Sequence, residues 1–157
     1  MNTYFKARGF REALYGLKHL EEPFQHRIIG AANREAAEPL IKRAQSIVQK
    51  KEGDLSESIG AVLKPQRKTK QLGIVWVGPR RVKGKFRGNH GHLIEFGHRI
   101  SKQKIQEGGN VLGFVRPYPY MRPAFISTKD QVIQKMRNSL VDKLNKWVKR
   151  NYVKNPL

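Results

Sequence analysis

Apolar residues recur at intervals of three and four along the N-terminal third of the chain, which is the spacing of amphipathic helices. One stripe lies within residues 1–24, a helical lead-in that Pro23 interrupts. A second, alanine-rich stripe runs from Gln25 to Lys51 and contains Pro39, which lacks an amide hydrogen and should kink this helix or split it in two. The second stripe consists of Ile29, Ala32, Ala36, Leu40, Ala44, Ile47 and Val48.

The middle of the chain has short β-rich runs instead. They predict four strands, at residues 59–64, 72–77, 92–96 and 111–116. The glycine-rich basic segment 80–91 and the polar segment 99–110 are expected to be flexible loops. A last helix is expected from about Ser127, with Ser127 or Thr128 as its cap and residues 151–157 as a frayed tail. Its apolar face consists of Val132, Ile133, Met136, Leu140, Leu144, Trp147 and Val148.

This order of elements predicts an α+β fold. We expect a small antiparallel sheet of about four strands, flanked by a long N-terminal helix that is kinked at Pro39 and by a C-terminal helix. The length of 157 residues fits one domain spanning 1–157. The chain has no cysteine, which excludes disulfides and cysteine-based metal sites. No run approaches the roughly 18 apolar residues of a membrane span, and no signal peptide is visible, so we expect synthesis in a cytoplasm.

The net charge of the chain bears on its binding partner. The chain carries 32 Lys and Arg against 12 Asp and Glu, a net charge of +20. Nucleic acid is the usual partner of such an excess, an anionic membrane surface or an acidic protein is an alternative, and a merely basic solvated surface is the plainest interpretation.

The positive charge is densest between residues 64 and 104, where 12 basic residues face a single acid, Glu95. Basic loops of this kind contact phosphates without reading bases, and the sparse aromatic residues there argue against base stacking. We therefore expect non-specific contact with DNA phosphates or with an acidic partner, and no membrane. The candidate contact residues are Lys64, Arg67, Lys68, Lys70, Arg80, Arg81, Lys83, Lys85 and Arg87.

The sequence offers little support for a catalytic site. His90, His92 and His98 with Glu95 form the best candidate metal cluster, and a nuclease would need a second ligand group that the final helix does not offer. There is no Gly-x-Ser-x-Gly elbow and no phosphate-binding Gly-x-x-x-x-Gly-Lys run. We expect no enzyme activity, no catalytic residue, no metal and no cofactor.

Two short segments carry the most specific pattern: His92 to Gly97, and the proline-bracketed run Tyr118 to Phe125. Glu95 lies in an otherwise apolar run, so its carboxylate should have a partner, and we predict Arg122. The run Tyr118 to Phe125 reads as a rigid corner that presents a surface to a neighbour. The predicted structural or interface residues are Glu95, Phe96, Gly97, Tyr120, Met121, Arg122, Pro123 and Phe125.

These segments also carry a resemblance. A long alanine-rich helix, the turn Gly53 to Ile59, the strand end Ile94 to Gly97 and the corner Pro119 to Phe125, in this order, resemble minor tail components or tail-completion (head–tail joining, neck) proteins of siphophages. The similarity covers about residues 12–150. The sequence departs from the family pattern before Gly53, where Pro-x-x-Thr-Gly is common, and at His98, where the family usually has Thr.

The resemblance implies a structural virion protein of the head–tail joint or of tail completion. Such proteins assemble as homo-oligomeric rings, commonly hexamers or dodecamers, around the DNA path, with other connector and tail proteins as partners. The implied location is the virion, and the host cytoplasm during assembly. The rival hypothesis from the residues alone is a stand-alone, sequence-independent nucleic-acid-binding protein.

Overall fold

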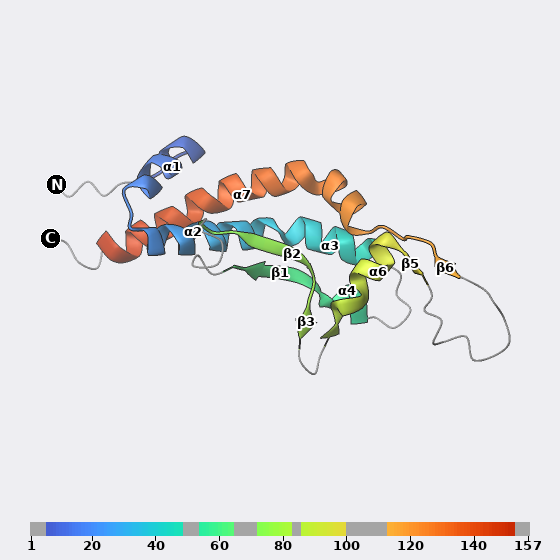
Figure 1. Cartoon of the computed structure of the whole chain (residues 1–157). Helices are drawn as coiled ribbons and strands as arrows, with labels where there is room; N and C mark the ends of the chain where they lie inside the picture. The colour runs from blue at the N-terminus through green and yellow to red at the C-terminus, as the bar shows by residue number, and fades with distance from the viewer. Residues whose placement is uncertain (1–5, 49–53, 65–71, 83–85, 100–112, 153–157) are drawn as a thin grey trace. The chain divides into compact units, whose positions relative to one another are not determined.

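The computed structural model describes residues 6–48, 54–64, 72–82, 86–99 and 113–152 (Figure 1). The helices are α1 (Phe10–Lys18), α2 (Glu22–Ala36), α3 (Glu38–Ile47), α4 (Asp54–Ser58), α6 (Gly91–Phe96) and α7 (Met121–Tyr152), with a short 3₁₀ turn η1 (Gly88–His90). The strands are β1 (Ile59–Leu63), β2 (Val75–Pro79), β3 (Arg81–Val82), β4 (Phe86–Arg87), β5 (His98–Arg99) and β6 (Phe114–Val115).

The chain divides into two compact units. The first unit takes residues 1–40, 61–77 and 128–157, and the second takes 41–60 and 78–127. Helix α7 therefore contributes its first turns to the second unit and the remainder to the first. The expectation of a single domain stays a prediction.

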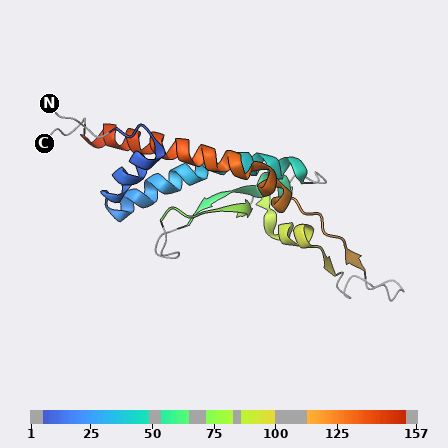
Figure 2. The same cartoon turned by 90° about the horizontal axis from the view of Figure 1, so that it is seen from above.

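The core of the first unit lies between α1, α2 and the C-terminal part of α7, and α2 and α7 run side by side in both views (Figures 1 and 2). Ala13 and Ala32 are fully buried, and such small side chains let helices approach closely. Asn145 of α7 holds the chain before α1 through two hydrogen bonds, because its side chain accepts from Ala7 N and donates to Ala7 O. The buried core residues are Ala7, Ala13, Leu17, Ile28, Ala32, Leu140, Leu144 and Val148.

Residue Gly73, just before β2, joins the sheet part of the first unit to α2. Its amide donates to His26 Nδ1 at 3.1 Å, and its carbonyl accepts from Asn33 Nδ2 at 2.9 Å. Its backbone φ of 65° is in the left-handed region that favours glycine. The segment that leads into β2 is thus held directly on α2, close to Ile29 and Gly30.

The second unit combines α4, α6, the two short pairs β3–β4 and β5–β6, and the beginning of α7. Both pairs are antiparallel, with Arg81 opposite Arg87 and His98 opposite Val115. The Ser58 carbonyl at the end of α4 accepts hydrogen bonds from Arg80 N at 2.9 Å and from Arg80 Nε at 3.3 Å. These contacts hold the end of β2 against α4.

The mixed helix-and-sheet class is confirmed, but the single four-stranded sheet is wrong. The described strands form three separate two-stranded sheets, β1–β2, β3–β4 and β5–β6. The predicted third strand, 92–96, is helix α6, and of the predicted fourth strand only Phe114–Val115 is a strand within the described residues. The helix at 91–96 is stabilised by hydrogen bonds to residues 118–122, which are described below.

The predicted helices agree more closely with the structure than the predicted strands do. Helix α1 lies within the expected lead-in, and the long helix is indeed split before Pro39, into α2 and α3. Pro23, however, stands in the first turn of α2, where its missing amide hydrogen costs nothing. The expected loop 80–91 contains regular structure, because its described residues include β3, β4, η1 and the first residue of α6. Most of the expected loop 99–110 lies outside the described residues. Helix α7 extends to Tyr152, into the expected frayed tail.

The start of α7 was placed too late. The helix begins at Met121, so Ser127 and Thr128 are interior positions and cap nothing. The Ser127 hydroxyl donates to the Ala124 carbonyl one turn earlier, and Thr128 is buried. Pro123 falls in the first turn, which a proline tolerates. No helix in the described part of the chain is both long and apolar enough to span a bilayer.

Candidate functional site

The two sequence segments singled out above meet in the second unit, where they cap each other's helices. Glu95 Oε2 accepts hydrogen bonds from the amides of Tyr120 at 2.7 Å and Met121 at 3.0 Å, and Oε1 accepts from the amide of Arg122 at 3.3 Å. In return, the Tyr118 amide donates to the Ile94 carbonyl of α6 at 2.7 Å. The first amides of α7 and a carbonyl of α6 are thus satisfied by one reciprocal contact.

This geometry corrects the predicted Glu95–Arg122 pair. The partner of the carboxylate is the backbone of residues 120–122, and no ion pair between the two side chains is found among the described residues. The Arg122 side chain is exposed. A carboxylate at a helix N-terminus is favoured by both the free amides and the helix dipole, so Glu95 needs no guanidinium.

Gly97 ends α6 with φ 70° and ψ 172°, a conformation that only glycine adopts readily. A Cβ built on it would lie 2.5 Å from the Val115 carbonyl oxygen and 2.9 Å from Pro117 N. In the Glu-Phe-Gly run, Glu95 therefore caps α7, Phe96 is exposed, and Gly97 ends α6. Phe96 between them is 75% exposed.

Tyr120 anchors the corner from inside. Its side chain is almost fully buried, and its hydroxyl donates to the Gly91 carbonyl at 3.4 Å. Gly91 lies so close that a Cβ there would be 2.7 Å from this hydroxyl. Burial, and after it the negative charge of Glu95, raises the pKa of Tyr120 from 10.0 to about 12.

This raised pKa gives a pH-dependent prediction. The folded state favours neutral Tyr120, so its contribution to the free energy of unfolding is complete below pH 10 and is lost as the pH rises through about 12. Relative to Tyr120→Phe, the wild-type chain should lose on the order of 2 kcal/mol over this range. Urea unfolding of both chains at pH 9 and pH 12 measures the difference; an unchanged difference contradicts the prediction.

The remaining predicted interface residues are largely at the surface. Phe125 is 54% exposed, Pro123 is exposed and Met121 is half-buried. Further apolar side chains of the second unit are exposed as well. We call the exposed apolar side chains Phe96, Phe114, Tyr118, Phe125 and Ile126 the corner group.

The predicted DNA-contacting cations are only partly described. Lys64, in the first unit, lies over the ring of Trp76 with Nζ 3.6 Å from its centroid. Arg80 is held by the Ser58 carbonyl in the second unit, and Arg81 is exposed. Arg67, Lys68, Lys70, Lys83 and Lys85 lie outside the described residues, as does the side chain of Arg87.

The histidine cluster gives no metal centre in the described part of the chain, where no group of three potential ligands comes together. His90 and His92 are exposed. The expectation that the protein needs no metal or cofactor stays a prediction.

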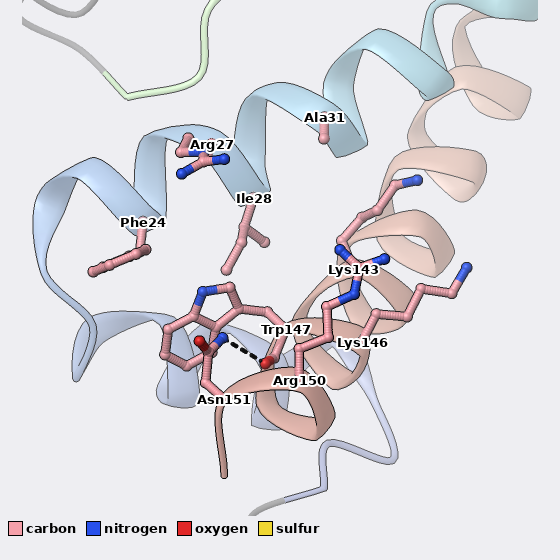
Figure 3. A pocket seen from close by; sticks show the side chains of 9 residues that line it. All are labelled: Phe24, Arg27, Ile28, Ala31, Lys143, Lys146, Trp147, Arg150 and Asn151. Atoms are coloured by element: carbon pink, nitrogen blue, oxygen red, sulfur yellow. Dashed lines mark hydrogen bonds between the residues drawn. The ribbon is translucent and has the colours of Figure 1, made fainter. Parts of the chain in front are cut away.

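A pocket that the sequence did not suggest lies in the first unit, between α2 and the last turns of α7 (Figure 3). Its volume is about 570 Å³, within the range typical of small-molecule sites. Figure 3 shows Trp147 between the two helices, with Phe24 and Ile28 on the α2 side. The lining residues are Phe24, Arg27, Ile28, Ala31, Lys143, Lys146, Trp147, Arg150 and Asn151.

The pocket combines an aromatic floor with a cationic rim. The rings of Trp147 and Phe24 lie 5.5 Å apart at 57°. Lys143 is neutralised by Glu35, 2.8 Å away; the hydrogen bonds from Lys143 and then from Ser139 lower the pKa of Glu35. Arg27, Lys146 and Arg150 are exposed and have no ion-paired carboxylate among the described residues.

The sequence contained part of the evidence for this pocket. Lys143, Lys146, Trp147 and Arg150 follow one another at steps of three, one and three, so they share a face of α7. Comparison with known protein families, with curated proteins and with solved structures finds no match to this chain.

Proposed function

We propose that this chain is a non-enzymatic structural component of a tailed-phage particle, at the head–tail joint or in tail completion. In this role it assembles as a ring of identical subunits around the DNA path. The observation that carries the proposal is the corner of the second unit, where a rigid, mutually capped backbone presents the exposed aromatic residues Phe96 and Phe125.

Two physical arguments support a ring. Groups of exposed apolar side chains often mark protein–protein contact sites; the corner group supplies five of them in one unit, and a closed ring would cover the same group on every subunit. The net charge of +20 per chain makes subunits repel one another unless an anion lies between them. DNA in the lumen would supply this anion, and non-specific phosphate contact would let it slide.

The oligomeric state of the purified chain tests this proposal. Native mass spectrometry, with and without duplex DNA, should show a closed ring, expected as a hexamer or dodecamer. The double substitution Phe96→Ser/Phe125→Ser should weaken assembly at least about tenfold, because it removes two large apolar contacts. Particles of the phage that encodes the chain should also contain it.

A matched control distinguishes a specific role of the corner group in assembly from a general effect of removing exposed apolar surface. Leu14 and Tyr15 are exposed on α1 in the first unit, so Leu14→Ser/Tyr15→Ser removes similar surface away from the corner. This variant should assemble like the wild type. A chain that stays monomeric with DNA and is absent from particles would refute the structural role.

A second candidate function is a stand-alone nucleic-acid-binding protein. The cationic pocket of the first unit favours it, since Arg27, Lys146 and Arg150 need no ring to meet a phosphate. A steep salt dependence of DNA affinity in a chain that remains monomeric would support this candidate over the ring.

A further inference from the structure

The pocket between α2 and α7 combines two aromatic rings with cations from both helices, a chemistry distinct from that of the corner group. We propose that this pocket binds a nucleotide of single-stranded nucleic acid, with the phosphate on the cationic rim and the base against Trp147.

The rim fits a phosphate. Arg27 comes from α2, and Lys146 and Arg150 come from α7, so the cations that line the pocket belong to both helices (Figure 3). The two arginines can each donate a pair of parallel N–H groups, which is the arrangement that phosphate oxygens accept best. Lys143 is already paired with Glu35, which leaves the other three as the charges available to a ligand.

The floor fits a base. Trp147 is partly buried, and its ring is held by its contact with Phe24 and by its position between α2 and the last turns of α7. Asn151 donates from Nδ2 to the Trp147 carbonyl, which further orders this turn of the helix. A partly exposed indole that packs on a second ring and lies beside cations can act as a stacking platform for a base.

An acidic peptide is the competing ligand. It would satisfy the rim, but it would place aliphatic or carboxylate groups on the floor, where a flat aromatic ring gains most from another flat ring. The volume of about 570 Å³ also suits a compact, planar ligand.

This inference deepens the nucleic-acid contact of the proposed function by naming one site. Its test uses the free full-length chain, so that failure of ring assembly and failure of the pocket are observed separately.

The experiment follows Trp147 fluorescence in a Trp76→Phe background, since the chain has two tryptophans and Trp76 is exposed. A short oligothymidylate should quench this fluorescence, whereas an oligonucleotide of the same length without bases should bind more weakly and quench little. Lys146→Ala/Arg150→Ala should lower the affinity about tenfold or more. The slope of log affinity against log salt should become shallower by about 1.4, the share of two phosphate contacts on a single strand.

The matched control is Lys129→Ala/Lys149→Ala, which removes two exposed cations of the same helix that do not line the pocket. This variant should keep most of the affinity and the full quenching. Equal losses in both variants would overturn the proposal, because only the overall charge would then matter. Polyglutamate binding that depends on Lys146 and Arg150, with oligonucleotide binding unaffected, would also overturn it.

Discussion

Glu95→Ala should destabilise the protein by about 3–5 kcal/mol. The carboxylate accepts three amide hydrogen bonds at the start of α7, and hydrogen bonds to a charged group each contribute about 1.5–3 kcal/mol without being additive. The substitution also leaves the amide of the buried Tyr120 without its acceptor. It removes a negative charge that interacts favourably with the dipole of α7. Glu95→Gln retains one acceptor oxygen and should cost about half as much.

Urea unfolding gives these free energies, and hydrogen exchange locates the loss. The amides of Tyr120, Met121 and Arg122 should exchange faster in Glu95→Ala, because they lose their acceptor. Glu57→Ala is the matched control in the same unit: Glu57 is exposed on α4, and its substitution should change the free energy of unfolding by less than about 0.5 kcal/mol. Equal effects of the two substitutions would mean that Glu95 does not cap α7.

The elements that were predicted correctly are those whose cause is local. Helix α1 follows from its apolar spacing, and the break between α2 and α3 follows from the missing amide hydrogen of Pro39. Strand β1 follows from a short β-rich run. Each of these signals acts within one or two turns of chain, so the sequence alone was sufficient.

Helix α6 was missed because what stabilises it is not local. The run Leu93 to Phe96, apolar except for Glu95, has the composition of a strand. Its helical form depends on the Tyr118 amide at Ile94 and on the use of Glu95 as a cap for α7, about 25 residues away in the chain. For the same reason, the start of α7 was predicted at Ser127, whereas the helix begins at Met121. Its cap comes from another segment, so the residues just before Met121 carry no local Ser, Thr or Asp signal.

The pocket was missed for a related reason. The contact of Ser139 with Glu35, and so the packing of α7 on α2, joins positions 104 residues apart. Periodicity places Lys146, Trp147 and Arg150 on one face of α7, but it cannot bring Arg27 and Phe24 opposite them. The sequence thus identified the parts of the corner and the amount of positive charge, while the distribution of that charge over a pocket required the fold.

Gly97→Ala should destabilise the protein by about 3 kcal/mol or more. The backbone at Gly97 has φ 70° and ψ 172°, where a side chain costs of order 1–3 kcal/mol. The added methyl group would also lie 2.5 Å from the Val115 carbonyl oxygen, which is backbone and cannot rotate away. Relief of this clash requires β6 to move from β5, or α6 to lose its last turn.

Gly78→Ala is the control that separates backbone strain from the general effect of replacing a glycine. Gly78 lies in β2, its φ is outside the left-handed region, and a Cβ there meets nothing within 4 Å. This substitution should be neutral or slightly stabilising, because alanine restricts the unfolded chain. If Gly97→Ala were equally harmless in urea unfolding, the Glu-Phe-Gly run would not be a helix stop. Because Gly97 directly follows Phe96, the same strain should displace this exposed ring, so Gly97→Ala should also weaken the proposed ring assembly, whereas Gly78→Ala should not.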